Sequence, residues 1–294
     1  MKISTLLESK QPTLSFEVFP PKTSELFENV MSATDAIASL KPDFMSVTYG
    51  AGGTTKGFTT EIAQSIQNKN GVTALAHLTC VGASKESLDA QLSELKARGI
   101  ENILALRGDL PKGVDNTNDW EYKHANELMT TIKEHGDFCI GGACYPEKHP
   151  ESSVLKEDIE NLKRKVEAGC DFLTTQMFFD NSLFFNYLYR VREAGINVPI
   201  VAGIMPVTNA KQMERIYKLS QAFLPRRFVS LLDKFGDNPK AMRQAGLAYA
   251  TDQVIDLIAS GINNIHIYTM NKPENARLLQ ESLSEIVPSC KKGE

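Results

Sequence analysis

A chain of 294 residues that is 42% hydrophobic and 23% charged has the composition of an ordinary globular enzyme. Its net charge of −4 gives no reason to expect nucleic acid or an anionic membrane surface as a partner, and no apolar run is long enough for a membrane helix. The five cysteines are scattered and form no Cys-x-x-Cys pair, which indicates neither a disulfide framework nor a zinc site. We therefore expect a cytoplasmic protein that acts on small molecules.

Short apolar runs alternate along the chain with segments of helical spacing. Apolar runs bounded by turn residues predict buried strands, and these runs begin near Leu14, Phe44, Thr73, Ile103, Phe138, Phe172, Pro199 and Asn264. The intervening segments predict helices over residues 25–40, 59–68, 84–98, 153–168, 182–194 and 209–219, two more between 225 and 260, and a last one over 273–286. The first residues form a short leader in this interpretation.

The first four strands recur at a constant distance of 29 residues, counted from Ser15, Phe44, Thr73 and Asn102. A repeat of this length is that of a strand–helix unit. Eight strands alternating with eight or more helices predict a (β/α)8 TIM barrel of the α/β class, with extra helices before the last strand. No linker or shift in composition divides the chain, so we expect one catalytic barrel domain over residues 1–294.

The competing α/β fold is a doubly wound open sheet. Such a fold usually carries a glycine-rich turn after its first strand, but here that strand ends in Pro20-Pro21. A G-x-G-x-x-G match that starts at Gly50 fails because Thr55 occupies its last position, and a phosphate loop that starts at Gly108 fails because Val114 replaces the lysine. The barrel is therefore the favoured fold.

Charged residues follow the fourth strand directly, in the sequence Leu106-Arg-Gly-Asp109. Ligands bind at the C-terminal ends of barrel strands, and charges are costly to place there without a role. Arg107 and Asp109 are therefore candidate site residues. The alternative is a structural ion pair between these two residues.

Glu17 is the candidate acid at the end of the first strand. Its neighbours Phe16 and Val18 are apolar, so strand alternation places its side chain opposite theirs. We favour the barrel interior over the outer face for it, because a glutamate on the outer face would be covered by helices. A carboxyl group there is costly unless it has a function. His77 is open to two interpretations, a site residue or a satisfied core histidine, and the cluster around Lys165 could be a solvated helix face.

No two histidines or carboxylates have metal-ligand spacing on one element, so we expect no metal. A barrel with one candidate acid, one carboxylate near an arginine, and no metal or nucleophile fits an enzyme whose cofactor carries the difficult chemistry.

Six segments, in order and in register from about Ser15 to Lys272, resemble the bacterial methylenetetrahydrofolate reductases. They are Phe16-Glu-Val-Phe-Pro-Pro-Lys22, Ser46-Val-Thr-Tyr-Gly-Ala51, His77-Leu-Thr-Cys80, Leu104-Ala-Leu-Arg-Gly-Asp109, Tyr145-Pro-Glu-Lys-His-Pro150 and Gln176-Met-Phe-Phe-Asp180. The resemblance implies a (β/α)8 barrel with non-covalent FAD. It implies reduction of 5,10-methylenetetrahydrofolate to 5-methyltetrahydrofolate by NADH or NADPH, in a ping-pong mechanism that supplies methyl groups for methionine synthesis. We also expect a homo-oligomer.

The same resemblance assigns roles to individual residues. Glu17 corresponds to the general acid, and Asp109 to a carboxylate beside the flavin that also binds the pterin. The positions that correspond to FAD contacts are Thr48, Tyr49, Ala51, His77, Arg107, Gly108, Asp109, Ala125, Tyr145, His149, Ser152, Asp158, Asn161, Arg164 and Lys165. The positions that correspond to substrate contacts are Thr48, Asp109, Gln176, Gln212 and Lys272.

Two positions depart from the family pattern. Lys272 stands where relatives have arginine, which weakens a bidentate grip on a carboxylate, and Ile216 stands where some relatives have a stacking phenylalanine. Two alternatives remain: a flavin-free barrel aldolase or methyltransferase of one-carbon units, and a catalytically silent paralogue that acts through interactions. Retention of both Glu17 and Asp109 argues against the second.

Overall fold

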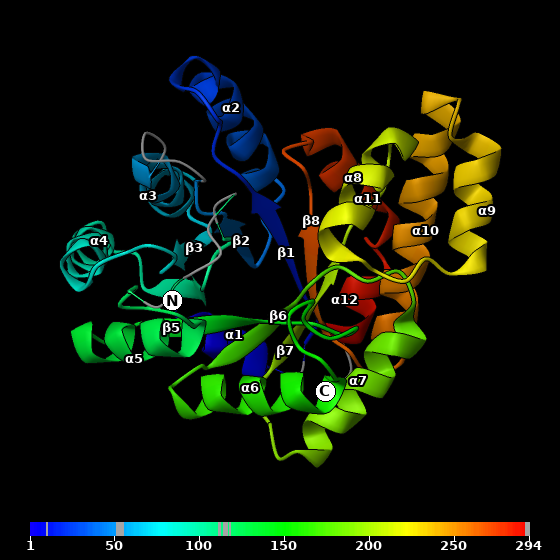
Figure 1. Ribbon diagram of the computed structural model, residues 1–294. Coiled ribbons are helices and arrows are strands. Elements are labelled where there is room, and N and C mark those ends of the chain that lie inside the picture. The colour runs from blue at the N-terminus through cyan, green and yellow to red at the C-terminus, as the bar shows by residue number, and fades with distance from the viewer. Residues whose placement is uncertain (10, 51–55, 111–112, 114–116, 118, 292–294) are drawn as a thin grey trace.

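The computed structural model describes residues 1–9, 11–50, 56–110, 113, 117 and 119–291. Its centre is a closed barrel of eight parallel strands that neighbour each other in sequence order (Figure 1). The predicted (β/α)8 barrel is thus confirmed. The strands are β1 Thr13–Val18, β2 Phe44–Val47, β3 Thr73–Thr79, β4 Asn102–Leu106, β5 Cys139–Cys144, β6 Phe172–Thr175, β7 Ile200–Ile204 and β8 Asn264–Tyr268.

Helices surround the barrel and connect its strands (Figure 1). Their bounds are α1 Ile3–Glu8, η1 Ser24–Leu26, α2 Phe27–Ala38, α3 Lys56–Gln64, η2 Ser65–Lys69, α4 Lys85–Ala97, α5 Ala125–His135, α6 Leu155–Glu167, α7 Asn181–Glu193, α8 Ala210–Ser220, α9 Arg226–Phe235, α10 Pro239–Ala259, α11 Pro273–Ser282 and α12 Ile286–Lys291. Helices α9 and α10 pack side by side before β8, which confirms the prediction of extra helices there.

The repeat of 29 residues corresponds to lateral pairing in the barrel. Ser15 pairs with Phe44, and Phe44 pairs with Thr73. The fourth member departs from this, because Asn102 pairs with Leu75 and not with Thr73. A closed barrel needs such a stagger between its strands, so the repeat identifies the units without giving their full register.

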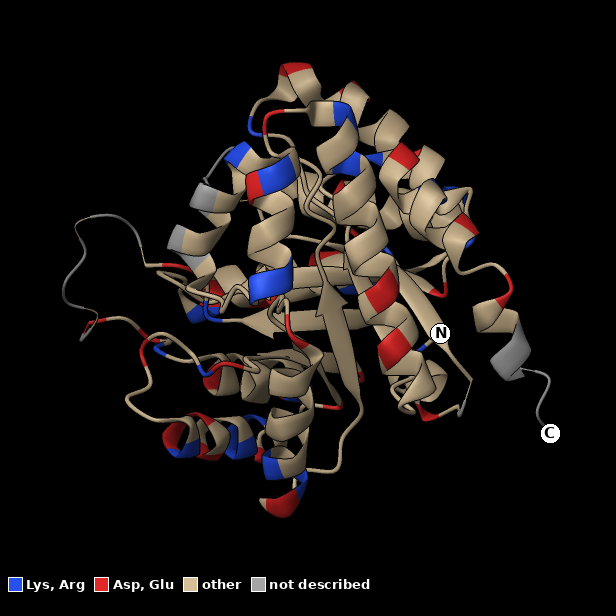
Figure 2. Cartoon of the chain, turned by 90° about the vertical axis from the view of Figure 1, so that its right-hand side faces the viewer, with Lys and Arg blue, Asp and Glu red and all other residues tan. Residues whose placement is uncertain are grey.

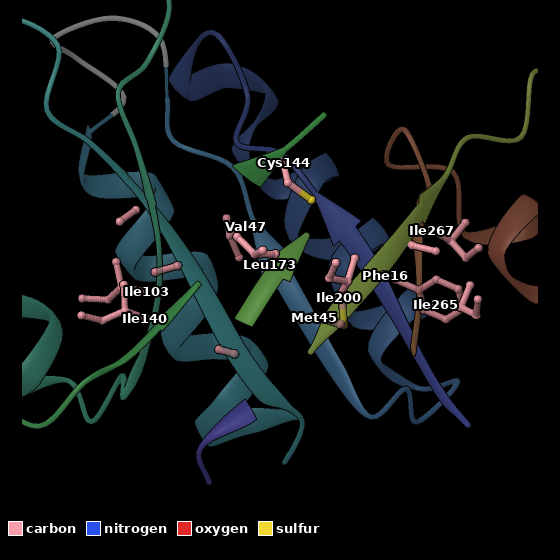
Figure 3. Close-up of a cluster of buried hydrophobic side chains, with 14 of the residues drawn as sticks. Phe16, Met45, Val47, Ile103, Ile140, Cys144, Leu173, Ile200, Ile265 and Ile267 are labelled. Atoms are coloured by element: carbon pink, nitrogen blue, oxygen red, sulfur yellow. The ribbon is translucent and has the colours of Figure 1, made fainter. Parts of the chain in front are cut away.

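The two faces of each strand have different environments. Outward side chains, among them Phe16, Val47, Ile103 and Leu173, form the main core between the strands and the helices (Figure 3). Inward side chains toward the N-terminal ends of the strands form a second apolar cluster around Phe44. Charged residues lie mainly on the outer helices and loops, whereas the central strands largely lack them (Figure 2). Glu17 is the only Asp, Glu, Lys or Arg residue within the eight strands, and it lies near the C-terminal end of β1.

The short leader of the sequence interpretation is in fact a helix, α1. Its Ile3 and Leu7 are buried in the inward apolar cluster at the N-terminal end of the barrel. The Asn102 side chain accepts a hydrogen bond from the Ile3 N–H at 2.8 Å, which ties α1 to β4. Six residues are too few to show helical periodicity in a sequence.

The sequence interpretation also missed α5 between β4 and β5. Its Leu128, Met129 and Ile132 are buried, and Glu127 closes a capping box with the residue before the helix. The sixth strand begins at Phe172, as predicted, and ends at Thr175, after which the Gln176 side chain accepts a hydrogen bond from the next backbone N–H. The last predicted helix likewise ends at Ser282, before a separate α12.

Candidate active site

A cavity of about 840 Å³ opens among the C-terminal ends of the strands. This is within the usual size of sites for small molecules and cofactors. The predicted site residues that line it are Glu17, Thr48, Tyr49, His77, Gly108, Asp109, Tyr145 and Gln176. The candidate acid and the candidate carboxylate therefore face one and the same cavity.

Glu17 extends into this cavity from the fifth position of β1, while its neighbours Phe16 and Val18 are buried in the outer core. The prediction of an interior side chain is confirmed. Its Oε2 atom lies 3.7 Å from His77 Nε2, 3.9 Å from His266 Nε2 and 3.5 Å from the hydroxyl of Ser46. The carboxyl group is thus surrounded by imidazole and hydroxyl groups, none of which holds it tightly.

His266 and Ser46 are site residues that sequence reasoning did not single out. The imidazole of His266 is 2% exposed, with Nδ1 at 2.8 Å from Ser15 Oγ and Nε2 at 3.2 Å from Ser46 Oγ. His266 alternates with Ile265 and Ile267 on β8, just as Glu17 alternates with its apolar neighbours. The same argument from alternation could have found it.

His77 projects into the cavity from β3. Its Nε2 atom is buried and has no hydrogen-bond partner among the described residues, so it is not a satisfied core histidine at that atom. Burial lowers the pKa of His77 to about 4, although the nearby Glu17 carboxylate opposes this shift. The ring is therefore neutral at pH 7 and offers one buried nitrogen to a ligand.

The two charged residues at the end of β4 point to different places. Asp109 lines the cavity, but the guanidinium of Arg107 binds both carboxylate oxygens of Glu151, at 2.6 and 2.7 Å. The alternative of an Arg107–Asp109 ion pair is therefore wrong, since the partner is Glu151. The hydrogen bonds from Arg107 lower the pKa of Glu151.

Gly108 stands between these two residues with a φ of +91°. A Cβ atom at this position would lie 2.8 Å from Val81 Cγ1 and 3.1 Å from Thr79 Cβ. Only glycine fits this backbone and this space. The bare backbone of residue 108 therefore forms part of the cavity wall.

A second group of predicted residues lies on α6 and the segment before it, outside the cavity lining: His149, Ser152, Asp158, Asn161, Arg164 and Lys165. The His149 ring contacts the Tyr145 ring edge to face at 4.7 Å, which joins this group to the cavity wall. The Ser152 hydroxyl donates to Asp158 at 3.3 Å, and burial raises the pKa of Asp158. Of this group, His149 thus adjoins the cavity wall directly.

The two basic neighbours Arg164 and Lys165 differ sharply. Arg164 is exposed and donates to Asn161 at 3.1 Å, so it belongs to a solvated face. The Lys165 ammonium reaches inward and donates to the carbonyl of Ala143, a residue of the cavity wall, at 2.8 Å. Burial lowers the pKa of Lys165. The interpretation as a solvated charged face therefore holds for Arg164 and fails for Lys165.

The remaining predicted positions lie apart from the cavity lining. Gln212 is half-buried on α8, and the Lys272 ammonium lies 3.4 Å from the hydroxyl of Thr208. Ala125 is the buried first residue of α5, and Ile216 is buried in a separate apolar cluster with Met213. Ala51 lies outside the described residues.

In the part of the chain that the structure describes, no three His, Cys, Asp or Glu residues are arranged to hold a metal ion. None of the helices described has the length and apolar character needed to cross a membrane. Cys80, Cys139, Cys144 and Cys170 are buried free thiols.

Comparison with known proteins identifies the family. The family model described as methylenetetrahydrofolate reductase matches residues 2–284. The chain belongs to the methylenetetrahydrofolate reductase family. It is 38% identical to the 5,10-methylenetetrahydrofolate reductase of Escherichia coli K12 over 264 residues, which cover 90% of this chain and 88% of that protein.

Other relatives in the methylenetetrahydrofolate reductase family differ in length. The chain is 38% identical over 261 residues to the enzyme of Pectobacterium carotovorum, covering 89% of this chain and 86% of the relative. It is 37% identical over 288 residues to methylenetetrahydrofolate reductase (NADH) 1 of Arabidopsis thaliana, covering 94% of this chain. The chain spans about half the length of that plant relative, with 49% covered.

Among solved structures, the fold matches an uncharacterized protein from Clostridium thermocellum that binds two copies of 5-methyl-5,6,7,8-tetrahydrofolic acid. The TM-score is 0.67 at 15% sequence identity, covering 97% of this chain and 100% of the other. At this identity the likeness concerns the barrel fold alone.

Proposed function

We propose that this chain reduces 5,10-methylenetetrahydrofolate to 5-methyltetrahydrofolate, with non-covalent FAD as cofactor and NADH or NADPH as electron donor. The observation that carries the proposal is the presence of Glu17 and Asp109 in the lining of one cavity at the C-terminal end of the barrel. Membership of the methylenetetrahydrofolate reductase family supports it. The cytoplasmic location, the single catalytic domain and the homo-oligomeric state stay predictions.

The residues present fit FAD. The cavity offers apolar walls from Leu75, Leu104 and Leu106, and a buried nitrogen on His77 that has no hydrogen-bond partner among the described residues. The buried ammonium of Lys165 beside the wall suits a phosphate. When bound, FAD would take a hydride from the nicotinamide and return it to the folate.

Glu17 would act as the general acid. Opening the five-membered ring of the folate expels an amine nitrogen, which must be protonated as its bond to carbon breaks. Glu17 is the one carboxyl residue on β1 that lines the cavity, and its side chain is only 18% exposed, which limits the access of competing water. Ser46 and His266 border the carboxyl on the protein side.

Asp109 would act through its charge. Ring opening leaves a cationic iminium group on the folate, and a carboxylate fixed in the same cavity stabilises that charge as it develops. Gln176, at the end of β6, lines the cavity and offers an amide to the pterin or the nicotinamide. Lys272 would contact the folate tail through its single ammonium group, which cannot form the bidentate contact that an arginine makes.

The proposal is tested on the purified protein in three steps. The protein should show flavin absorbance, which a flavin-free aldolase or methyltransferase would lack. Anaerobic mixing with NADH and, separately, with NADPH should bleach that absorbance and rank the two donors. Addition of methylenetetrahydrofolate should then restore the absorbance and yield 5-methyltetrahydrofolate. A colourless protein, or a bleached protein that the folate does not reoxidise, would contradict the proposal.

A further inference from the structure

The segment between β8 and α11 has an unusual backbone. Met270 and Asn271 have φ values of +54° and +53°. Side chains disfavour this left-handed region, and two consecutive residues in it that are not glycine are uncommon. Such a conformation persists only where its surroundings enforce it, and it concentrates at functional sites.

The side chains of this segment hold the end of β1. Asn271 accepts a hydrogen bond from the N–H of Phe19 at 2.9 Å and donates one to the carbonyl of Phe19 at 2.8 Å. The hydroxyl of Thr269 donates to the carbonyl of Glu17 at 2.6 Å. We call these three bonds, made by Thr269 and Asn271, the β8–β1 clamp.

The clamp replaces backbone pairing that the chain cannot provide. The ladder between β1 and β8 ends with the pair Glu17 and Tyr268. Phe19 is followed by Pro20 and Pro21, which have no backbone N–H and cannot extend a strand. The amide of Asn271 imitates a peptide group and pairs with Phe19 beyond the end of the ladder.

Glu17 depends on this backbone support. The polar neighbours of its Oε2 atom lie at 3.5, 3.7 and 3.9 Å, which is too far for strong hydrogen bonds. The position of the carboxyl group is therefore set mainly by its backbone, which the clamp fixes at Glu17 and Phe19. The same segment leads directly into Lys272, whose N–H donates to the Thr269 carbonyl at 3.1 Å.

We propose that Asn271 is a positioning residue that holds the β1 backbone so that the Glu17 carboxyl reaches the reacting nitrogen of the folate. The proposal rests on the function proposed above. The clamp lies on the β8–β1 side of the barrel, whereas Arg107 follows β4, His149 follows β5, and Lys165 lies on α6. Loss of the clamp should therefore slow the folate step without affecting flavin retention or the nicotinamide step.

The test compares Asn271→Gly with Asn271→Ala. Glycine accepts a positive φ without strain, so the first variant removes the side-chain bonds alone, while the second adds backbone strain. Both should slow reoxidation by methylenetetrahydrofolate roughly 10- to 100-fold, because a displacement of about 1 Å costs that much. Flavin content and bleaching by the nicotinamide should stay within about twofold of the wild type, since neither depends on Glu17.

Two further variants keep the test decisive if an Asn271 variant folds poorly. Thr269→Val removes the bond to the Glu17 carbonyl at nearly constant volume and should slow the same step. Asn238→Ala is the matched control, because Asn238 also holds two backbone N–H groups with its side chain, but at the start of α10. This control should leave the folate step unchanged.

The outcomes are distinct. A wild type that methylenetetrahydrofolate does not reoxidise would contradict the proposed function, and the positioning role would fall with it. If the wild type is reoxidised and Asn271→Gly matches it, the positioning role alone is wrong. Parallel loss of flavin content, nicotinamide step and folate step would also overturn it, because that pattern indicates general damage.

Discussion

The two sides of the barrel mouth are built on different principles. On the β8–β1 side, uncharged groups fix the backbone around Glu17 through short hydrogen bonds from Thr269 and Asn271. On the side of β4, β5 and α6, charged side chains dominate: Arg107 is paired with Glu151, and the half-buried Lys165 donates to the Ala143 carbonyl of the cavity wall. One side holds an acid in place, and the other presents charge.

The difference separates two tasks of the proposed reaction. Proton transfer needs fixed geometry, which hydrogen bonds to the backbone supply. An anionic cofactor needs cationic partners, and ionic contacts at a partly exposed rim can be exchanged for contacts to phosphate. Substitutions on the two sides should therefore affect different steps, and the following predictions test that separation in order of decreasing effect.

Glu17→Gln should give the largest effect. The amide cannot donate a proton to a leaving amine, so folate reduction should fall at least ~100-fold. Flavin content and nicotinamide oxidation should be preserved. Rapid-reaction measurement of each half-reaction checks this, and a folate rate close to that of the wild type would show that Glu17 is not the acid.

Asp109→Asn should slow the folate step by a barrier increase of ~2–4 kcal/mol, because the iminium cation loses a nearby negative charge. The same change removes a negative charge from the flavin's surroundings, so the midpoint potential should become more positive. Stopped-flow kinetics and a redox titration measure the two effects. An intact folate step, or a potential that is unmoved or lowered, would remove this role from Asp109.

Lys165→Ala and Arg164→Ala should weaken FAD retention to different degrees. Loss of the buried ammonium of Lys165 should cost ~2 kcal/mol of binding, since charge-assisted bonds are strong where water is excluded. Loss of the exposed Arg164 should cost ~0.5 kcal/mol. Titration of FAD into each deflavinated variant gives the dissociation constants. Unchanged FAD affinity in Lys165→Ala would contradict its role in FAD binding, and a loss in Arg164→Ala as large as in Lys165→Ala would contradict the predicted difference between them.

His77 should make stability depend on pH. Burial lowers the pKa of His77 in the folded chain to about 4. At pH values between this pKa and the higher pKa of the unfolded chain, His77 is protonated in the unfolded chain but not in the folded chain. Stability is therefore lost as the pH falls through that window, on the order of 1 kcal/mol between about pH 7 and about pH 5.5. Urea unfolding of the wild type and His77→Gln checks this, and an equal slope in both would contradict it.

The sequence predicted the barrel, its extra helices and the inward orientation of Glu17, because these follow from local periodicity. Contacts that depend on folding were not accessible in the same way. Ser46 and His266 are distant in sequence and meet only when β1 closes the barrel with β2 and β8. Likewise, the choice of Glu151 rather than Asp109 as the partner of Arg107 depends on the path of a loop.

Neighbouring residues on one helix illustrate the same limit. Arg164 and Lys165 look equivalent in the sequence. Because adjacent residues of a helix point in different directions, Arg164 is exposed while Lys165 reaches the Ala143 carbonyl. The Asn271 clamp was invisible for a related reason. Asn271 can be recognised in the sequence as a polar residue that follows the last strand, but its function in the fold depends on the carbonyl and amide of Phe19, 252 residues away.

The separation of the two sides is tested most directly by comparing one single variant from each side in the same two-step assay. Glu17→Gln and Lys165→Ala are reduced anaerobically with the nicotinamide in the presence of saturating FAD, then mixed with methylenetetrahydrofolate while flavin absorbance is followed. We predict that Glu17→Gln becomes reduced at the wild-type rate and then stays reduced, whereas Lys165→Ala completes both steps once its flavin site is filled. Loss of both steps in both variants, or rapid reoxidation of Glu17→Gln, would contradict the account.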